Sequence, residues 1–316
     1  MDALYNAVKP RVVAIGGPTA TGKTALSVAL AKRFGGEIIS ADSMQIYQGL
    51  DVGTAKVTPE EMQGVPHHLV GFLAPEQAFS VADFTTLAGK TITQLTAQGK
   101  LPLVVGGTGL YITSLLNGIG FTPEKVDPAI RQELQARLQA EGSQALYAEL
   151  AAVDPGYAAK VHPNNTPRVI RALELYRATG RKMSAEREAA RPAEKPYRSL
   201  CLCLTCRDRT LLYQRIDTRC DRMMQSGILE EAKLVYDHRD TYRTAAQAIG
   251  YKEFFPYFEG TADLESCLAH LKQASRNYAK RQLTWFRRQN DAVWLYIDEE
   301  NVIERACSLV REFLQN

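Results

Sequence analysis

The sequence predicts an α/β fold in which a mostly parallel sheet is flanked by helices, with an all-helical insertion domain. Short apolar runs typical of buried strands alternate with amphipathic helical patterns in the first and last parts of the chain. A glycine-bounded loop joins the first such run to the first helix. Between 121 and 196 only helical patterns occur. We therefore expect a core domain formed by 1–120 and 197–316, and a helical insertion domain at 121–196.

The loop at 16–24 has the pattern of a phosphate-binding loop. It reads Gly-Gly-Pro-Thr-Ala-Thr-Gly-Lys-Thr and lies between an apolar strand at 11–15 and a helical pattern at 25–34. Its glycines let successive backbone N–H groups turn toward phosphate oxygens, and the helix adds its positive dipole end. Lys23 supplies a positive charge, and the hydroxyl of Thr24 is placed to ligate Mg²⁺.

A chance glycine-rich turn is the alternative, but the complete motif in its strand–loop–helix context predicts a P-loop NTPase-like core. The residues predicted to bind the phosphate group are Gly17, Pro18, Thr19, Ala20, Thr21, Gly22, Lys23 and Thr24.

Polar residues follow the next two central strands. Asp42 follows a strand at 37–41, and Gly-Gly-Thr, ending in Thr108, follows a strand at 101–105. Because ligands of α/β sheets bind at the carboxyl ends of the strands, we expect both residues beside the phosphate loop. Asp42 could act as a general base or cap a helix. Thr108 could hydrogen-bond an acceptor or be a simple turn threonine.

The other elements follow from the same periodicities. His67 and His68, interpreted as structural, open a strand candidate that runs to residue 72, and Ser80 with Asp83 forms a capping box. Thr166 is expected to cap a helix that begins at Pro167. Further helices are predicted at 127–140, 143–152, 208–225 and 302–314, and further strands at 198–205 and 292–297.

Basic residues concentrate on several of these helices. Arg168 and Arg171 share a helix face in the insertion. Arg215 and Arg219 lie four residues apart, where they could close over a pyrophosphate. The stretch 276–288 interleaves basic and aromatic residues, which suits contacts with a nucleic-acid backbone. Solvated charged faces are the alternative explanation.

Composition is that of an ordinary soluble globular protein, with 45% apolar and 23% charged residues among 316. The net charge of +3 does not decide for or against a nucleic-acid partner. No run approaches the roughly 20 apolar residues that a membrane helix needs, so we expect a cytoplasmic protein without a membrane partner. Cys201, Cys203 and Cys206 lack a fourth ligand at zinc spacing and are interpreted as buried free thiols.

Together, these motifs resemble the tRNA dimethylallyltransferase family, also called the tRNA isopentenyltransferase family. The phosphate loop alone would be unspecific, whereas seven motifs in the family's order are highly specific. Because the sequence ends without the zinc-finger extension of eukaryotic relatives, we expect the bacterial form. The matching stretches are 17–24, 40–47, 53–56, 106–111, 165–174, 249–253 and 279–286.

The resemblance implies transfer of a dimethylallyl group from dimethylallyl pyrophosphate to N6 of the adenosine just 3′ of the anticodon in tRNA. The phosphate loop would then hold an isoprenoid pyrophosphate, with Mg²⁺ as cofactor. Lys23 and Arg219 would stabilise the leaving pyrophosphate, Asp42 would accept a proton or hydrogen bond from N6, and Thr108 would help to hold the base. The implied tRNA-binding residues are Asp42, Ser43, Met44, Gln45, Thr108, Arg131, Pro167, Arg168, Val169, Ile170, Arg171, Gly250, Tyr251, Lys252, Lys280 and Arg281.

We therefore expect a monomer whose partners are the anticodon stem-loop of tRNA and dimethylallyl pyrophosphate. A P-loop kinase of a nucleoside or small metabolite is the alternative function, and a non-catalytic RNA-binding protein is a third hypothesis. An ATPase usually carries an aspartate where this chain has Gly-Gly-Thr, so the pattern disfavours ATP hydrolysis. The basic and aromatic stretch at 276–288 disfavours a small-metabolite kinase.

Overall fold

The computed structural model describes residues 9–121, 127–190, 192 and 194–316. It divides into two compact units, which we call unit 1 (Met1–Leu116 with Lys195–Asn316) and unit 2 (Asn117–Glu194). The boundaries predicted from the sequence were at 120 and 197. Unit 1 contains the sheet and three hydrophobic clusters, whereas the described part of unit 2 has its own apolar core.

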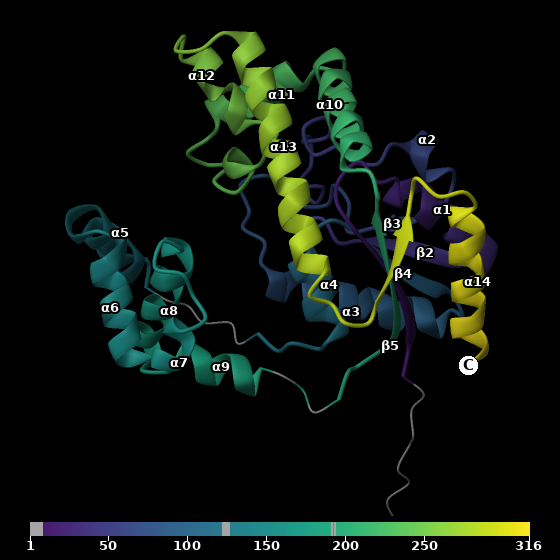
Figure 1. Cartoon of the computed structure of the whole chain (residues 1–316), viewed down its shortest axis with the longest axis horizontal. Helices are drawn as coiled ribbons and strands as arrows, with labels where there is room; N and C mark the ends of the chain where they lie inside the picture. The colour runs from purple at the N-terminus through teal and green to yellow at the C-terminus, as the bar shows by residue number, and fades with distance from the viewer. Residues whose placement is uncertain (1–8, 122–126, 191, 193) are drawn as a thin grey trace, which may run out of the picture. The chain divides into compact units, whose positions relative to one another are not determined.

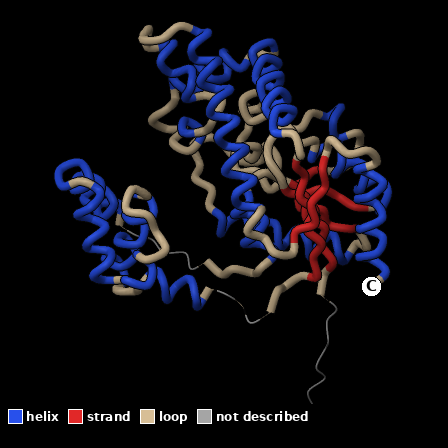
Figure 2. Tube along the Cα trace, viewed as in Figure 1, coloured by secondary structure: helices blue, strands red, loops and turns tan. Residues whose placement is uncertain are grey.

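Unit 1 is built on a sheet that has six strands among the described residues, in the order β3-β2-β4-β1-β5-β6. Figure 2 shows the strands of this sheet in red, with helices around them. All of its pairings are parallel, where the sequence predicted a mostly parallel sheet. The strand β4 is apolar along its whole length, and β1 is apolar after Arg11, as expected where both faces of a sheet are covered. The strands are β1 (Arg11–Gly16), β2 (Gly36–Ser40), β3 (His67–His68), β4 (Leu101–Val105), β5 (Arg198–Thr205) and β6 (Ala292–Tyr296).

Helices cover both faces of this sheet. Successive side chains of β1 point to opposite faces, so Val13 and Ile15 enter one hydrophobic cluster while Val12 and Ala14 enter another. The first cluster includes residues of α1 and α14, which lie side by side in Figure 1. The second includes residues of α3, α4 and the end of α13. These helices are α1 (Lys23–Phe34), α14 (Val302–Gln315), α3 (Val81–Ala97), α4 (Gly109–Leu116) and α13 (Leu264–Phe286).

A third hydrophobic cluster of unit 1 lies among helices outside the sheet. Here α13 packs along α10, and Figure 1 shows the two helices next to each other. Tyr47, from the loop after β2, is buried in this cluster with Tyr251 and Phe254. The elements are α10 (Arg209–Gln225), α11 (Ile228–Asp237), η1 (Ala245–Gln247), η2 (Lys252–Phe254) and α12 (Phe255–Phe258), and α2 (Pro59–Met62) completes unit 1.

Backbone hydrogen bonds continue past the carboxyl ends of the three central strands. The N–H of Ala41 donates to the carbonyl of Val105 (2.7 Å), that of Gly106 to Ile15 (3.1 Å), and that of Thr108 to Ala41 (3.2 Å). A Cβ atom at position 106 would lie 2.1 Å from the Ala41 carbonyl oxygen, so this close approach requires glycine. The loops after β1, β2 and β4 are thereby held against one another.

Unit 2 is helical throughout the part that the structure describes. Leu134, Leu146, Leu150 and Leu173 are buried together from three of its helices, which explains why their apolar positions recur at helical spacing. The helices are α5 (Pro128–Glu141), α6 (Ser143–Val153), α7 (Pro155–Ala158), α8 (Thr166–Thr179) and α9 (Met183–Ala189).

Three predictions about local structure were wrong. The strand expected to run to residue 72 ends at His68, because Leu69 adopts the left-handed conformation (φ 60°). Thr166 is the first residue of α8 rather than its cap, which is Asn165. The basic stretch at 276–288 is helical only to Phe286, so its last two arginines lie beyond α13.

Other local predictions were confirmed. Ser80 and Asp83 form the expected capping box. His68 binds the carboxylate of Glu37 through Nε2 (2.6 Å), a structural contact. Cys201, Cys203 and Cys206 are free thiols, of which Cys203 and Cys206 are buried as expected and Cys201 is partly exposed.

Among the described residues, no group of three or more His, Cys, Asp or Glu side chains could hold a metal ion. Over those same residues, no helix has the length and apolarity to cross a bilayer.

We expect Gly106→Ala to destabilise unit 1 by about 1–3 kcal/mol, because the added methyl group must displace backbone atoms. The shift in the urea midpoint of the purified protein measures this. Gly89→Ala is the matched control, since its Cβ would meet only the Tyr197 hydroxyl at 3.4 Å, and alanine within a helix should be neutral or stabilising by about 0.5–1 kcal/mol. Equal midpoints for the two variants would contradict the role of Gly106.

Candidate functional site

Unit 1 contains a cavity of about 1470 Å³ that is lined by the phosphate loop and the segment after β2. Its wall is completed by the end of β4, residues of α10, the 243–252 segment, and α13 between Leu271 and Gln282. The predicted site residues that line it are Thr19, Ala20, Gly22, Lys23, Thr24, Asp42, Ser43, Met44, Gln45, Arg219, Gly250, Lys252 and Arg281. Those of unit 1 outside this lining are Gly17, Pro18, Thr21, Thr108, Tyr251 and Lys280.

The phosphate loop has the predicted geometry. Gly17 has φ 136°, and a Cβ there would lie 2.5 Å from the Leu204 carbonyl oxygen, so glycine is required. Gly22, at φ 80°, caps α1, which begins at Lys23. The first N–H groups of α1 have no acceptor within the helix, and the positive end of its dipole is directed at the loop. This part of the cavity is therefore suited to an anion.

Side chains from outside the loop hold it in this shape. Arg215 of α10 donates from Nε to the Ala20 carbonyl (2.9 Å). Gln282 of α13 accepts a bond from the Thr19 N–H (3.0 Å) and donates to the Gly107 carbonyl (3.0 Å). The Thr19 N–H is thus used by the protein itself. Gln282 is buried, and it was not predicted as a site residue although it lies in the motif at 279–286.

Two cations and one carboxylate meet in the cavity. Burial and, to a smaller extent, the nearby charge of Arg219 lower the pKa of Lys23 to about 8, although the charge of Asp42 opposes the shift. Burial also lowers the pKa of Arg219, which Asp42 again opposes. Lys23 donates to the Pro18 carbonyl (2.7 Å) and, like Arg219, forms no ion pair within the described chain. Two desolvated cations facing one carboxylate favour an anionic ligand.

Asp42 divides its carboxylate between the protein and the cavity. Its Oδ1 accepts hydrogen bonds from the N–H groups of Met44 (2.9 Å) and Gln45 (3.3 Å), which fixes the turn after β2. No helix follows, so the helix-cap alternative is wrong. Its Oδ2 accepts no hydrogen bond from the residues that the structure describes. One oxygen therefore remains for a ligand.

Thr108 and Tyr278 border Asp42. The Thr108 hydroxyl accepts a bond from the Ser43 N–H (3.1 Å) and so joins the end of β4 to the turn that carries Asp42. Tyr278 of α13 lines the cavity, and burial together with the charge of Asp42 raises its pKa to about 12. Its phenol is therefore a hydrogen-bond donor at neutral pH. Tyr278 was not predicted as a site residue, because an aromatic residue in a helix is usually a core residue.

The remaining predicted residues of unit 1 differ in exposure. Lys280 and Arg281 are exposed near aromatic rings, with Lys280 Nζ 5.9 Å from the Tyr213 centroid and the Arg281 guanidinium 5.4 Å from that of Tyr278. Lys252 is exposed, whereas Tyr251 is fully buried.

In unit 2, the predicted tRNA-binding residues differ in their exposure and in their contacts. Arg168 and Pro167 are exposed, whereas the side chains of Val169 and Ile170 are buried in the core of the unit. Arg131 donates two hydrogen bonds to the carboxylate of Glu174 (2.9 and 3.0 Å), and Arg171 donates one (2.9 Å). Glu174 is only 4% exposed, so the two arginines also have a structural partner.

Comparisons with known proteins show which proteins this chain is similar to. A family model described as "IPP transferase" matches residues 45–289, and one described as "Isopentenyl transferase" matches 10–70. The chain is 50% identical over 289 residues to the tRNA dimethylallyltransferase of Bacillus subtilis, covering 92% of this chain and 91% of that protein. It is 49% identical over 284 residues to that of Geobacillus thermodenitrificans, covering 90% of each.

Solved structures of similar proteins extend the comparison. The tRNA isopentenylpyrophosphate transferase of Bacillus halodurans superposes with a TM-score of 0.72 at 44% identity, covering 97% of both chains. A eukaryotic dimethylallyltransferase acting on tRNA superposes with a TM-score of 0.81 at 31% identity, covering 97% of this chain and 80% of the other.

The Glu174 cluster predicts a pH-dependent stability of unit 2. Burial alone would raise the pKa of Glu174, but the hydrogen bonds and charges of Arg131 and Arg171 hold it below its ordinary value. Because the folded-state pKa is depressed, the carboxylate stabilises the unit above the ordinary glutamate pKa, and this contribution disappears as the pH falls through the lowered value.

We therefore expect Glu174→Gln to reduce hydrogen-exchange protection of α8 at about pH 7 and to differ little from the wild type at about pH 3. Glu188→Gln, which changes an exposed glutamate of the same unit, should leave α8 protection unchanged at both pH values. A reduction that is the same at both pH values would contradict an ionic role of Glu174.

Proposed function

The chain belongs to the IPP transferase family of tRNA dimethylallyltransferases, and we propose that it transfers the dimethylallyl group of dimethylallyl pyrophosphate to N6 of the adenosine just 3′ of the anticodon in tRNA. It is an enzyme of the prenyltransferase type rather than a kinase. One observation supports the proposed chemistry most strongly: two desolvated cations and a carboxylate with a free oxygen line one cavity.

The residues after β4 give a physical reason why the phosphate loop need not bind ATP. The position where an ATPase carries its magnesium-binding aspartate is occupied by Gly106 and Gly107. A Cβ atom on Gly107 would lie 2.2 Å from Nε2 of Gln282, so no larger side chain fits without moving that amide. This arrangement disfavours the kinase alternative.

The residues divide into a leaving-group side and an acceptor side. On the first, Lys23, Arg219 and the N-terminus of α1 would stabilise the negative charge that grows on pyrophosphate as its bond to C1 of the dimethylallyl group breaks. On the second, Asp42 would accept through Oδ2 the proton that the N6 amine loses as the new N–C1 bond forms. Pyrophosphate then leaves with the bonding electrons.

Mg²⁺ fits this site as an ion held mainly by the substrate. Thr24 lines the cavity with a hydroxyl that can serve as a ligand, and the described residues offer no cluster of three acidic, His or Cys side chains. Magnesium commonly keeps several waters and binds substrate phosphates. We propose that Thr24 would hold it and that it would neutralise phosphate charge.

The acceptor side suits a base taken out of an RNA loop. An enzyme that modifies the exocyclic amine must extract the base from its stack. Met44, Gln45 and Tyr278 line the cavity near Asp42, and Lys252 and Arg281 supply exposed positive charge at its wall for RNA phosphates. We propose that the anticodon stem-loop binds here, and that the enzyme acts as a monomer in the cytoplasm.

Incubation with labelled dimethylallyl pyrophosphate and an anticodon stem-loop RNA tests the reaction. We expect label on the RNA, and nuclease digestion should release it as an N6-substituted adenosine. An RNA with guanosine at the target position is the control and should remain unlabelled. Transfer of phosphate from ATP without any transfer of label would refute the proposed function.

Asp42→Asn tests the proposed base more cleanly than alanine does. Asparagine can keep the acceptor that holds the N–H groups of Met44 and Gln45, while it removes the charge. We expect kcat to fall at least about 100-fold with a nearly unchanged Kd for the RNA. Asp42→Ala, which also loses the turn, should weaken RNA binding as well. A wild-type kcat in Asp42→Asn would exclude Asp42 as the base.

A further inference from the structure

The acceptor side of the cavity depends on a long loop at 42–56. Between Ser40, the last residue of β2, and Pro59, the first of α2, the chain forms no helix and only an isolated bridge between Tyr47 and Leu73. Residues 42–45 and 51–56 of this loop line the cavity. Because a loop without a strand or helix satisfies few of its own polar groups, other contacts must fix its shape.

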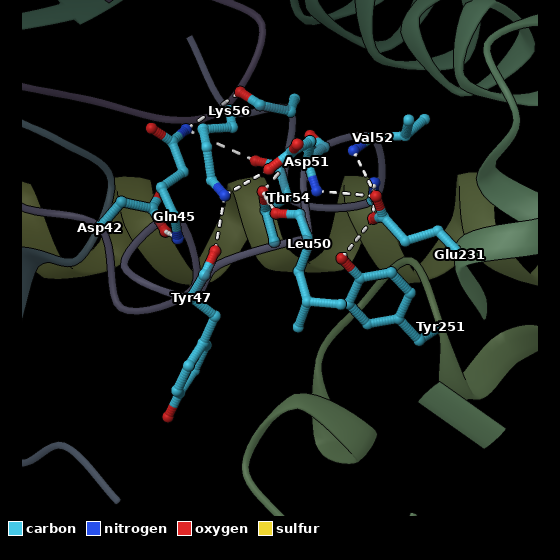
Figure 3. A network of polar contacts seen from close by, with 12 residues as sticks. Asp42, Gln45, Tyr47, Leu50, Asp51, Val52, Thr54, Lys56, Glu231 and Tyr251 are labelled. Carbon is cyan, nitrogen blue, oxygen red and sulfur yellow. Dashed lines mark hydrogen bonds and ion pairs between the residues drawn. The ribbon is translucent and has the colours of Figure 1, made fainter. Parts of the chain in front are cut away.

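Glu231, on α11, provides such a contact. Its Oε2 accepts hydrogen bonds from the N–H groups of Asp51 (2.7 Å) and Val52 (2.9 Å), and its Oε1 accepts one from Gly53 (2.8 Å). The Tyr251 hydroxyl donates a fourth bond to Oε1 (2.6 Å). Figure 3 shows these donors converging on the carboxylate. Three successive backbone N–H groups form a concavity suited to an anion, and here the anion belongs to the protein.

The loop also fits tightly against the residues around Tyr251. A Cβ atom at Gly53 would lie 2.3 Å from the Tyr251 ring, and one at Gly250 would lie 2.9 Å from the Gly53 carbonyl oxygen. Tyr251 is fully buried, and burial beside the carboxylate of Glu231 raises its pKa, so its hydroxyl keeps its proton. The side chain of Tyr251, predicted from the resemblance to bind RNA, contacts Glu231 inside the protein.

Hydrogen bonds inside the loop lead from this anchor to the cavity. The Gln45 side chain donates to the Ala55 carbonyl (3.1 Å), and Lys56 donates to the Tyr47 carbonyl (2.5 Å) and to the carboxylate of Asp51. Gln45 also donates its N–H to Asp42 (3.3 Å). In Figure 3 these contacts lie between Asp42 at one end and Glu231 with Tyr251 at the other.

We propose that Glu231, supported by Tyr251, is a positioning residue that fixes the 42–56 loop so that Gln45 and Asp42 are preset for the acceptor base. The proposal rests on the proposed function. Glu231 does not line the cavity, so it acts through the loop and not on the substrate. The phosphate loop lies outside this network and is held by Gln282 and Arg215.

Glu231→Gln tests the proposal, because its amide group would present N–H donors to backbone N–H donors. We expect kcat/KM for the stem-loop RNA to fall about 10- to 100-fold, as misplacement of reacting groups typically gives. The Kd for dimethylallyl pyrophosphate without RNA, and its binding stoichiometry, should stay at wild-type values. A merely structural role would reduce the stoichiometry and the transfer rate together, and that result would overturn the proposal.

Two further variants complete the experiment. Glu230→Gln makes the same change at an exposed neighbour on the same helix and should transfer like the wild type. Tyr251→Phe keeps the buried ring and removes one of the four hydrogen bonds, so we expect a loss of about 3- to 10-fold in kcat/KM for RNA. If Glu231→Gln does not fold, Tyr251→Phe decides, and a wild-type kcat/KM in that variant would overturn the proposal. An inactive wild-type enzyme would instead refute the proposed function.

Discussion

Three backbone hydrogen bonds beyond the carboxyl ends of β1, β2 and β4 are the constraint on which the site depends. They link Ile15, Ala41 and Val105 with the residues that begin the next loops. The contact is so close that position 106 has no space for a side chain. Because of it, the phosphate loop, the turn at Asp42 and the Thr108 hydroxyl meet at one edge of the sheet, although they are far apart in sequence.

Electrostatics then gives this edge its chemical character. Burial disfavours the charged forms of Lys23 and Arg219, and the negative charge of Asp42 offsets this cost only in part. A pyrophosphate that replaces the lost hydration would relieve this cost, and its growing charge during bond cleavage would be stabilised further. The fold thus holds positive charge at the place where the proposed reaction creates negative charge.

The parts of the site that could be predicted from the sequence are those formed by residues close together in the chain. The glycines and Lys23 of the phosphate loop, Asp42 at a strand end and the strands themselves all follow from neighbouring residues. Residues that act through distant partners could not be found in this way. Gln282 binds Thr19 from 263 positions away, and Glu231 binds Asp51 from 180 positions away.

Because distant partners cannot be found from local patterns, the sequence also left open whether the arginines of unit 2 bind RNA or a partner within the protein. Their helical spacing shows a shared face, but it does not show that a glutamate on that face binds both of them. Arg131 lies 43 positions from Glu174, so its partner becomes visible only when the two helices pack. The left-handed Leu69 that ends β3 is a similar case, because an isolated apolar run gives no sign of such a conformation.

Two backbone turns in the described part of unit 1 are suited to bind an anion: the phosphate loop and residues 51–53. One is open to a ligand and the other is already bound by the protein, and this difference explains how the cavity can select where an anion binds. The N–H groups at 51–53 are saturated by Glu231, so this concavity is closed to ligands and serves as a rigid support. In the described phosphate loop, the N–H of Thr19 is the only one that donates to a side chain from outside the loop, and Lys23 and Arg219 line the cavity. An incoming anion therefore finds one prepared position rather than two. If the proposed reaction is correct, the internal carboxylate keeps pyrophosphate away from the acceptor side while it fixes the loop that must receive the base.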